Sequence, residues 1–314
     1  MTTPTYTDAR DGTRLAEHRW LPEGEVRATI QLVHGLSEHA GRYARLAGAL
    51  TAAGFAVAAL DQRGHGLTAR STGPGGFGPG ATSEAVLDDV RDLGDRLAAE
   101  HPGLPRFLLG HSLGSAVALA SAEQDGEELD GLVLSGPIGV APHLAAAVPQ
   151  LEAAVAAGTG DRPMDALSGF NAPFEPARTP HDWLSRDEAE VDAYLADPLC
   201  GDDFPPTHAY GAGMFALVVR CATPEAVAGL PAGLPVLLLS GQRDPVGGED
   251  AAQVTALAGL LRDRGLPVEQ RVYPDARHEV FNETNRDEVT ADLLAWLEAR
   301  LDAGLEAGSE ARPG

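Results

Sequence analysis

The sequence contains no lysine. All 23 of its basic side chains are arginine, set against 46 aspartates and glutamates in 314 residues, so the formal net charge is −23 at neutral pH. A surface of this charge repels polyanions, which argues against nucleic acid as a partner and limits contact with an anionic membrane to transient encounters. The lack of lysine in a chain rich in alanine and glycine is typical of high-GC coding bias and indicates no function of its own.

The chain has only two cysteines, Cys200 and Cys221. Two thiols cannot form a disulfide framework, and no Cys/His spacing of the kind that binds zinc is present. We expect both thiols to be free and buried, although the sequence leaves open whether they pair. No motif indicates a metal or a cofactor, and we expect neither.

Long apolar runs are also missing. A membrane-spanning helix needs roughly 18 uninterrupted apolar residues, and the richest segment, residues 145–157, is broken by Pro149, Gln150 and Glu152. The first residues do not show a basic region followed by an apolar run, which is the pattern of a secretory signal. The sequence therefore predicts a soluble cytoplasmic protein, and it predicts no particular oligomeric state.

Short apolar runs alternate regularly with amphipathic segments over much of the chain. We predict strands at residues 28–33, 55–60, 106–109, 132–135, 236–240 and 268–273. We predict helices at residues 43–53, 84–100, 113–123, 249–264 and 286–301. Repeated strand–helix–strand units imply right-handed crossovers, and hence an α/β fold with a mostly parallel sheet.

This alternation stops between residues 137 and 230, where alanine-rich helical stretches and proline-rich connectors replace it. We interpret residues 137–230 as a helical cap inserted into one α/β core, which is made of residues 1–136 and 231–302. Residues 303–314 are rich in glycine, glutamate and alanine, and we predict that they form a flexible tail.

The segment Gly110-His-Ser-Leu-Gly114 lies between a predicted strand and a predicted helix. A serine on such a sharp turn needs small residues two positions before and after it, and the turn exposes its hydroxyl beside the helix N-terminus. We therefore predict that Ser112 is a catalytic nucleophile. The alternative is an ordinary glycine-flanked turn in which Ser112 caps the helix.

A serine nucleophile needs a base, and the base needs an orienting carboxylate. In this kind of fold they follow the serine in the order acid, then histidine. Asp244 and His278 each come just after a predicted strand and fit that order. Asp275 is a competing acid in the same loop as His278, and His111 is a poor base because neighbours on the turn point apart.

An oxyanion hole needs two backbone N–H groups aimed at the reacting carbonyl oxygen. We predict the N–H of Leu113, directly after the serine, and that of Leu36, in the loop His34-Gly-Leu-Ser-Glu-His39. Gly35 permits close approach of the backbone there. For His34, His39 and His65, which lie in loops at the same edge, we favour structural or positioning roles.

Five motifs occur together in this order. They are His34-Gly-Leu-Ser-Glu-His-Ala-Gly-Arg-Tyr43, Asp61-Gln-Arg-Gly-His-Gly66, Gly110-His-Ser-Leu-Gly-Ser115, Gly241-Gln-Arg-Asp244 and Arg277-His-Glu-Val-Phe-Asn-Glu283. The set resembles monoacylglycerol lipases and lysophospholipase-like α/β-hydrolases, a branch that includes serine aminopeptidases. The resemblance spans roughly residues 10–302, and Asp197-Pro-Leu199 looks like the cap segment of that family.

The resemblance implies an eight-stranded, mostly parallel α/β-hydrolase sheet flanked by helices, with a helical cap over the active site. It places the catalytic roles on Ser112, Asp244 and His278, and the oxyanion donors on Leu36 and Leu113. One departure is Thr68, where the family usually has serine, and the change keeps a small hydroxyl.

We therefore expect a serine hydrolase that cleaves a small acyl ester, such as a monoacylglycerol or lysophospholipid, through an acyl-enzyme. Candidate substrate-binding residues are His34, Gly35, His111, Phe170, Phe174 and Phe215. Other apolar cap residues that fit an acyl pocket are Val148, Leu151, Val155 and Leu217, although apolar residues at helical spacing more often belong to a core. Two alternatives stay open: a serine aminopeptidase or amidase, and a non-hydrolytic ligand-binding protein on the same scaffold.

Overall fold

The computed structural model describes residues 3–310, and eight of its strands form one sheet in the order β1-β2-β4-β3-β5-β6-β7-β8. The strands are β1 (Thr5–Asp8), β2 (Arg14–Trp20), β3 (Ala28–Val33), β4 (Phe55–Leu60), β5 (Arg106–His111), β6 (Gly131–Ser135), β7 (Val236–Gly241) and β8 (Val268–Tyr273). In this order, all neighbouring strands from β4 to β8 are parallel. At the other edge, β1 pairs antiparallel with β2, and β2 pairs antiparallel with β4. The predicted α/β-hydrolase fold class is confirmed.

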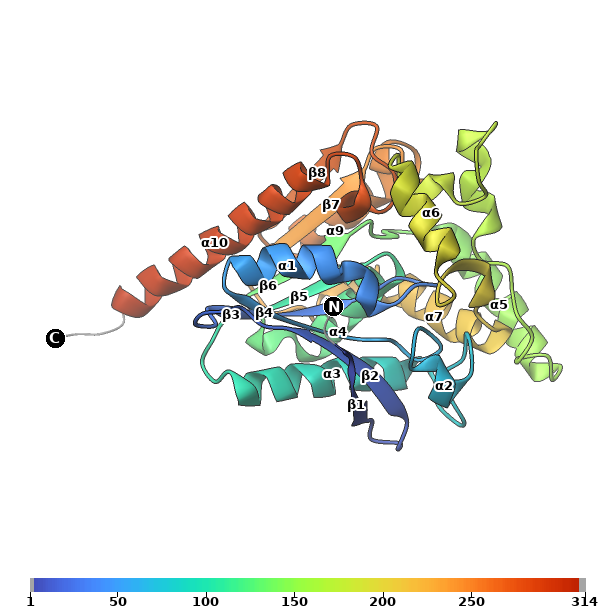
Figure 1. Ribbon diagram of the computed structural model, residues 1–314, viewed down its shortest axis with the longest axis horizontal. Coiled ribbons are helices and arrows are strands. Elements are labelled where there is room, and N and C mark those ends of the chain that lie inside the picture. The colour runs from blue at the N-terminus through green and yellow to red at the C-terminus, as the bar shows by residue number, and fades with distance from the viewer. Residues whose placement is uncertain (1–2, 311–314) are drawn as a thin grey trace.

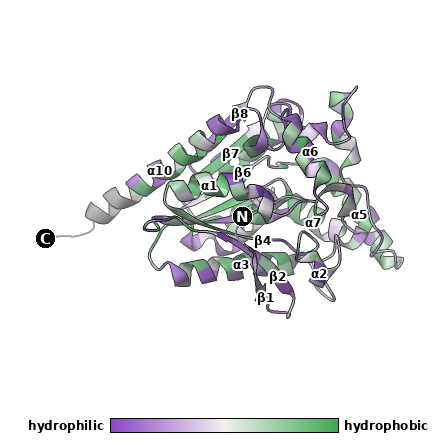
Figure 2. Cartoon of the chain, viewed as in Figure 1, coloured by the Kyte–Doolittle hydropathy of each residue, from purple (hydrophilic) through white to green (hydrophobic). Residues whose placement is uncertain are grey.

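Helices cover both faces of this sheet (Figure 1). One face is covered by α1 (Ala44–Ala52) and α10 (Arg286–Glu310), and the other by α3 (Ser83–Glu100), α4 (Leu113–Asp125) and α9 (Ala252–Asp263). Strands buried on both sides are apolar throughout rather than alternating. In β6, for example, Leu132 and Leu134 pack under α4 while Val133 packs under the α1 side. Figure 2 shows the matching pattern, with green central strands and helices of mixed colour.

The remaining helical elements are short or belong to the inserted segment. Outside it lie η1 (Ala40–Tyr43), α2 (Ala69–Thr72), η2 (Gly126–Glu128), η6 (Glu249–Ala251) and η7 (Val280–Asn282). Between β6 and β7 lie α5 (Pro142–Ala156), η3 (Ser168–Phe174), η4 (Asp182–Leu184), α6 (Glu188–Ala196), η5 (Gly201–Asp203), α7 (His208–Cys221) and α8 (Pro224–Val227). Figure 1 shows α5, α6 and α7 grouped at one end of the sheet.

The helices of the inserted segment differ in how they are held. Helix α7 packs on α3 and α4, and it contributes Tyr210, Met214 and Leu217 to the core beneath the sheet. Helix α5 has no buried residue and packs on α7. The segment predicted as a cap is therefore continuous with the core through α7 and most exposed at α5.

Three features differ from the expectations or complete them. Strands β1 and β2 were not visible as apolar runs, because they lie at the sheet edge and carry polar residues. Helix α10 continues to Glu310 despite Gly304 and Gly308, so residues 303–310 are helical where a flexible tail was expected. Residues 311–314 of that expected tail lie outside the described residues. Cys200 and Cys221 are free and buried.

None of the helices within residues 3–310 has both the length and the apolar composition required to cross a bilayer.

Candidate active site

The sequence-predicted catalytic residues lie at the carboxyl ends of neighbouring parallel strands. Ser112 follows β5, Asp244 follows β7 and His278 follows β8, while the loop carrying Leu36 follows β3. Parallel strands bring their carboxyl ends to one edge of the sheet, where ligands bind in open α/β folds. Residues separated by more than 160 positions in the sequence thus meet at one edge.

Ser112 lies on a strained turn between β5 and α4. Its backbone has φ 52° and ψ −121°, and its side chain makes no capping hydrogen bond to α4. A Cβ on Gly110 would lie 2.2 Å from the carbonyl oxygen of Gly114, and a Cβ on Gly114 would lie 2.3 Å from that of Val33. Both positions therefore require glycine. Because the hydroxyl does not cap the helix, the purely structural interpretation of this turn loses its main support.

His278 and Asp244 form a buried pair. The Nδ1 atom of His278 lies 2.9 Å from Oδ2 of Asp244, and neither residue is more than 2% exposed. Oδ1 of Asp244 accepts a hydrogen bond from the backbone N–H of Val246 at 2.8 Å. Burial by itself lowers the pKa of His278, but the charge and hydrogen bond of Asp244, with Glu279 and Glu38, outweigh it and raise the pKa.

The competing acid and base lie elsewhere. Asp275 is exposed, has φ 57° and occupies a turn in which its N–H donates to Gln242. His111 is buried with its Nδ1 3.1 Å from the carbonyl oxygen of Ser135, and its ring packs 4.8 Å from that of His278. Burial and the neighbouring His278 lower the pKa of His111 to about 4, so it stays neutral. This corrects the expectation that His111 contacts substrate.

The loop after β3 packs directly against the serine. A Cβ on Gly35 would lie 3.1 Å from Cβ of Ser112, which is the close approach expected of this glycine. Within residues 3–310, the backbone N–H groups of Leu36 and Leu113 have no hydrogen-bond acceptor. Two unpaired donors beside one hydroxyl are the arrangement that an oxyanion hole requires.

His34 holds loops together rather than lining the cavity. Its Nε2 accepts a hydrogen bond from the N–H of Gln62 at 2.9 Å, and its side chain is fully buried. Burial lowers its pKa, so the ring is a neutral acceptor. The expectation that His34 contacts substrate is corrected in the same way, whereas a positioning role agrees with these contacts. His39 is similarly engaged, with Nε2 2.9 Å from Asp197.

A cavity of about 530 Å³ opens over Ser112 and His278. Its lining includes Gly35, Leu36, Leu113, Phe170 and Phe215 from the sequence prediction. Apolar residues that the sequence did not single out also line it: Ile138, Leu144, Ala147, Met164, Leu167, Trp183, Leu184 and Val246. The volume and the apolar lining suit a ligand with a hydrocarbon chain.

Phe174 does not line this cavity. The guanidinium of Arg277 lies 4.4 Å from the centre of its ring, so Phe174 packs against the loop that carries the histidine. Val148, Leu151, Val155 and Leu217 are also absent from the lining. Leu217 belongs to the core and Val155 is 40% exposed. Helical spacing identified apolar residues in this segment but not the direction in which each one faces.

The chain matches a known family over most of its length. Residues 24–285 match the family described as serine aminopeptidase, S33. The chain belongs to this family.

Two relatives that align with this S33 member over most of their length are named as lipases. The monoacylglycerol lipase of Mycolicibacterium smegmatis is 35% identical over 300 residues, covering 92% of this chain and 95% of that protein. The monoglyceride lipase of Homo sapiens is 30% identical over 287 residues, covering 88% and 86% respectively.

Solved structures agree with this assignment. A thermostable carboxyl esterase from Bacillus coagulans matches the S33 member with a TM-score of 0.89 at 28% identity, covering 95% of this chain and 98% of that one. A monoglyceride lipase from Saccharomyces cerevisiae matches with a TM-score of 0.76, 22% identity and 96% coverage of both chains, which shows the shared fold. The protein is an ester hydrolase of the monoacylglycerol lipase-like branch of the α/β-hydrolases.

A buried charge network supports the site of this S33 member, and spacing along the chain did not indicate it. Arg42 donates to Glu38 at 2.9 Å and to both carboxylate oxygens of Glu279, at 2.5 and 2.8 Å. Glu38 also accepts from the N–H of Gly35 at 2.5 Å and from the hydroxyl of Tyr43 at 2.7 Å. Although burial opposes ionisation, Arg42 and two nearby histidines lower the pKa of Glu38 to about 2.

This network joins the two loops that carry the site. Glu38 fixes the loop after β3 through the N–H of Gly35, and Glu279 adjoins His278. Arg42 lies between the two carboxylates and holds both loops in one geometry. The signal in the sequence was the charged residues inside two of the five motifs, but only contacts in space show that they pair.

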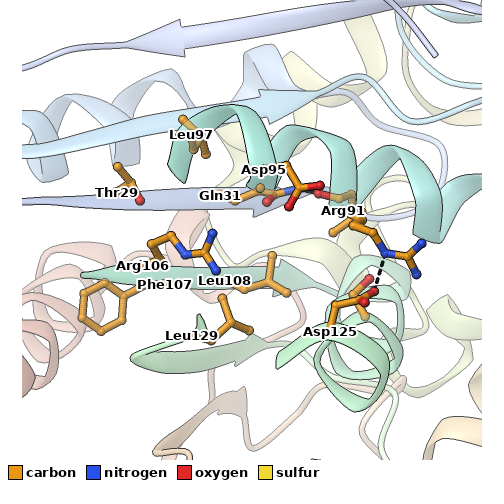
Figure 3. Close-up of a pocket in the computed structure, with 13 residues that line it drawn as sticks. Thr29, Gln31, Arg91, Asp95, Leu97, Arg106, Phe107, Leu108, Asp125 and Leu129 are labelled. Carbon is orange, nitrogen blue, oxygen red and sulfur yellow. Dashed lines mark hydrogen bonds and ion pairs between the residues drawn. The ribbon is translucent and has the colours of Figure 1, made fainter. Parts of the chain in front are cut away.

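A second cavity of about 70 Å³ lies on the side of the sheet covered by α3 and α4 (Figure 3). Its lining includes Gln31, Asp95 and Arg106, and an ion pair of 2.6 Å joins Arg91 to Asp125 beside it. None of the predicted catalytic residues lines this cavity. It is too small for a substrate chain, and we assign the chemistry to the larger cavity.

Proposed function

We propose that the protein is a serine hydrolase that cleaves a neutral acyl ester of the monoacylglycerol kind through an acyl-enzyme. The observation that carries the proposal is the position of Ser112, whose uncapped hydroxyl shares a cavity with His278, itself hydrogen-bonded to Asp244.

In the proposed reaction, the Oγ atom of Ser112 attacks the ester carbonyl while Nε2 of His278 takes its proton. Asp244 holds the imidazole in the required tautomer through Nδ1. The N–H groups of Leu36 and Leu113 stabilise the negative oxygen of the tetrahedral intermediate. His278 then protonates the leaving alcohol, and water attacks the acyl-enzyme by the same steps to release the acid. Every step uses protein groups and water.

The cavity lining favours a neutral leaving group. It contains three carboxylates, Glu38, Asp165 and Glu279, and no arginine. Burial opposes but does not prevent ionisation of Glu38 and Glu279, and hydrogen bonds from Ser168 lower the pKa of Asp165, so all three are charged at neutral pH. Arg42 offsets only one of the two charges on Glu38 and Glu279, so the lining keeps a net negative charge that would repel a phosphate on the substrate. This supports a glyceryl ester over an anionic lysophospholipid.

We therefore expect a monoacylglycerol to be hydrolysed with a kcat/KM at least about tenfold above that of the 1-acylglycerol 3-phosphate with the same chain, a difference of about 1.4 kcal/mol. Both substrates are compared below their micellar concentrations, with released fatty acid as the readout. The ratio should shrink only in part in high salt, because Asp165 is exposed and screened whereas Glu38 and Glu279 are buried. Equal rates at low salt would contradict the selection of neutral esters.

The pH dependence of kcat/KM tests the role of His278. The imidazole acts as a base only when neutral, and Asp244 raises its pKa above the ordinary value of about 6.5. Activity should therefore be full above this raised pKa and fall about tenfold per pH unit below it. A profile that stays flat down to pH 5 would show that another group is the base.

The aminopeptidase alternative has less support in the cavity. Recognition of a free α-ammonium group needs a carboxylate without a cationic partner. Glu38 and Glu279 are both paired with Arg42, which leaves Asp165 in the lining, whose Oδ1 accepts the backbone N–H groups of Leu167 and Ser168. A series of 4-nitrophenyl esters compared with aminoacyl 4-nitroanilides decides between the two. Faster turnover of the anilides would make the protein an amidase.

Labelling with a fluorophosphonate tests the proposal directly and separates it from a ligand-binding role. We expect one phosphonyl group per chain, located on Ser112 by peptide mass spectrometry and absent from the Ser112→Ala variant. A folded protein that binds monoacylglycerol but takes no label would be a binding protein on this scaffold.

A further inference from the structure

Residues 182–185 of the inserted segment are bonded to the loop that carries the proposed base. The carbonyl oxygen of Trp183 accepts the N–H of His278 at 3.3 Å, and that of Leu184 accepts the N–H of Glu279 at 2.8 Å. Arg277 donates to the carbonyl oxygens of Asp182 and Ser185. Part of the cap is therefore paired residue by residue with the loop after β8.

The side chain of Trp183 packs against the imidazole itself. The two ring centres are 5.0 Å apart with an angle of 37° between the planes, and Trp183 is 3% exposed. The residue is held in turn by η3, because the backbone N–H of Trp183 donates to Oδ1 of Asn171 at 3.0 Å and the indole ring packs 4.9 Å from the ring of Phe170. A large, fixed aromatic ring thus lies against the group that has to transfer the proton.

A ring in this position restricts the imidazole in two ways. It limits rotation of the His278 side chain, so that Nδ1 stays on Asp244 and Nε2 stays towards the cavity shared with Ser112. It also keeps water away from one part of the imidazole, which disfavours the charged form of His278. Misplacement of a catalytic group by about 1 Å can cost about 100-fold in rate.

We propose that Trp183 is a positioning residue for His278. In this role the inserted segment holds the imidazole of the base in place and also covers the substrate. This inference rests on the proposed function, in which His278 is that base. It assigns a role in proton transfer to a cap residue that motif spacing did not indicate.

Ion pairs fix the same part of the cap to the core. Arg186 donates to Glu283 at 2.8 Å, and Arg286 donates to Asp187 at 2.5 Å. Arg186 and Asp187 both lie in the short connection between η4 and α6. Helix α5 has no buried residue, and no salt bridge joins it to other residues in the described part of the chain. Access to the cavity is therefore expected on the α5 side, while the Trp183 side stays with the core.

The test compares Trp183→Ala, Trp183→Leu and Trp183→Phe with a matched control, Trp296→Phe. Trp296 is also a buried indole, 2% exposed, but it packs on Phe107 in the core under α10. The substrate is 4-nitrophenyl acetate, whose acyl group is too short to depend on the far wall of the cavity. Thermal unfolding and circular dichroism establish that each variant is folded.

For Trp183→Ala we expect kcat to fall about 10- to 100-fold with KM changed less than about twofold. Trp183→Phe should recover most of the loss because an aromatic ring is restored, and Trp183→Leu should recover little. The acid limb of kcat/KM should move to higher pH in Trp183→Ala, since water relieves the burial that lowers the pKa of His278. Trp296→Phe should leave kcat and the limb unchanged.

Two results would overturn the inference. One is a folded Trp183→Ala or Trp183→Leu variant with the wild-type kcat and pH profile for 4-nitrophenyl acetate. A residue that serves only as a wall of the cavity would leave the hydrolysis of this short ester unchanged. The other is an equal loss of kcat in Trp296→Phe. Ser112→Ala is measured alongside: turnover in that variant would refute the proposed function itself, whereas an inactive Ser112→Ala beside wild-type-like Trp183 variants would refute this inference alone.

Discussion

Replacing Ser112 with alanine is expected to reduce kcat for ester hydrolysis by roughly a millionfold, because the nucleophile, the base and the acid act as one unit. The background that remains comes from the oxyanion donors and from substrate binding. The fold should be unaffected, since alanine keeps a Cβ at the same strained backbone angles as serine. Initial rates with 4-nitrophenyl butyrate, with thermal unfolding of both proteins, measure the two effects.

Ser121→Ala is the matched control for this substitution. Ser121 lies on the same helix, α4, is 7% exposed, and lines the small cavity remote from the site. It should retain wild-type kcat. A Ser112→Ala protein with more than about 1% of wild-type turnover would show that another residue is the nucleophile, because loss of a serine nucleophile costs far more than 100-fold.

A third variant tests the strain at the turn. Ser112→Gly should be as inactive as Ser112→Ala yet unfold at a higher temperature, because only glycine adopts a φ of 52° without cost. The expected gain is about 1 kcal/mol. Equal stability of the glycine and alanine variants would mean that the turn stores no strain.

Replacing Asp244 with asparagine is expected to lower kcat by about 10⁴-fold with little change in structure. The asparagine amide can donate to Nδ1 of His278, which places the imidazole proton on Nε2, where it cannot accept the proton of Ser112. The acid limb of the pH profile should also move to lower pH, because the charge that raises the pKa of His278 is gone. Steady-state rates between pH 5 and 9 measure both effects.

Asp275→Asn is the control, since Asp275 is the competing acid and is exposed in a turn. It should retain activity close to wild type. If Asp275→Asn rather than Asp244→Asn lost activity, the hydrogen bond between Asp244 and His278 would not be the one that orients the base.

The fold was largely predictable because parallel strands are buried on both faces. Runs such as Phe55–Leu60 and Val236–Gly241 are apolar at nearly every position, and they lie between amphipathic helices. Strand β2, Arg14–Trp20, lies next to the edge strand β1 and has no such run, since it carries Arg14, Glu17, His18 and Arg19. Pattern reasoning therefore identified the six parallel strands and missed the antiparallel edge.

The catalytic candidates were predictable for a different reason. Each lies directly after a strand, so chain order and strand ends together bring Ser112, Asp244 and His278 to one edge of the sheet without knowledge of packing. The glycines around Ser112 also have a local cause, because Gly110 and Gly114 leave no room for a Cβ. Short-range sequence carries this information.

The surroundings of these residues depend on contacts between distant segments. His34 and His111 lie in the right loops but pair with backbone groups, and Phe174 packs on Arg277 instead of lining the cavity. Arg42 shows the same limit, since it pairs with Glu38 four residues earlier and with Glu279 more than 230 residues later.

The sequence by itself therefore determined the α/β-hydrolase class, the central strands and the placement of the candidate nucleophile, acid and base after successive strands, because burial periodicity and strand ends are local properties of the chain. Only the tertiary structure decided which cap residues face the substrate, which carboxylates share Arg42, and that Trp183 packs on His278. Those outcomes depend on how side chains from separate elements fill one space, and spacing along the chain does not specify that packing.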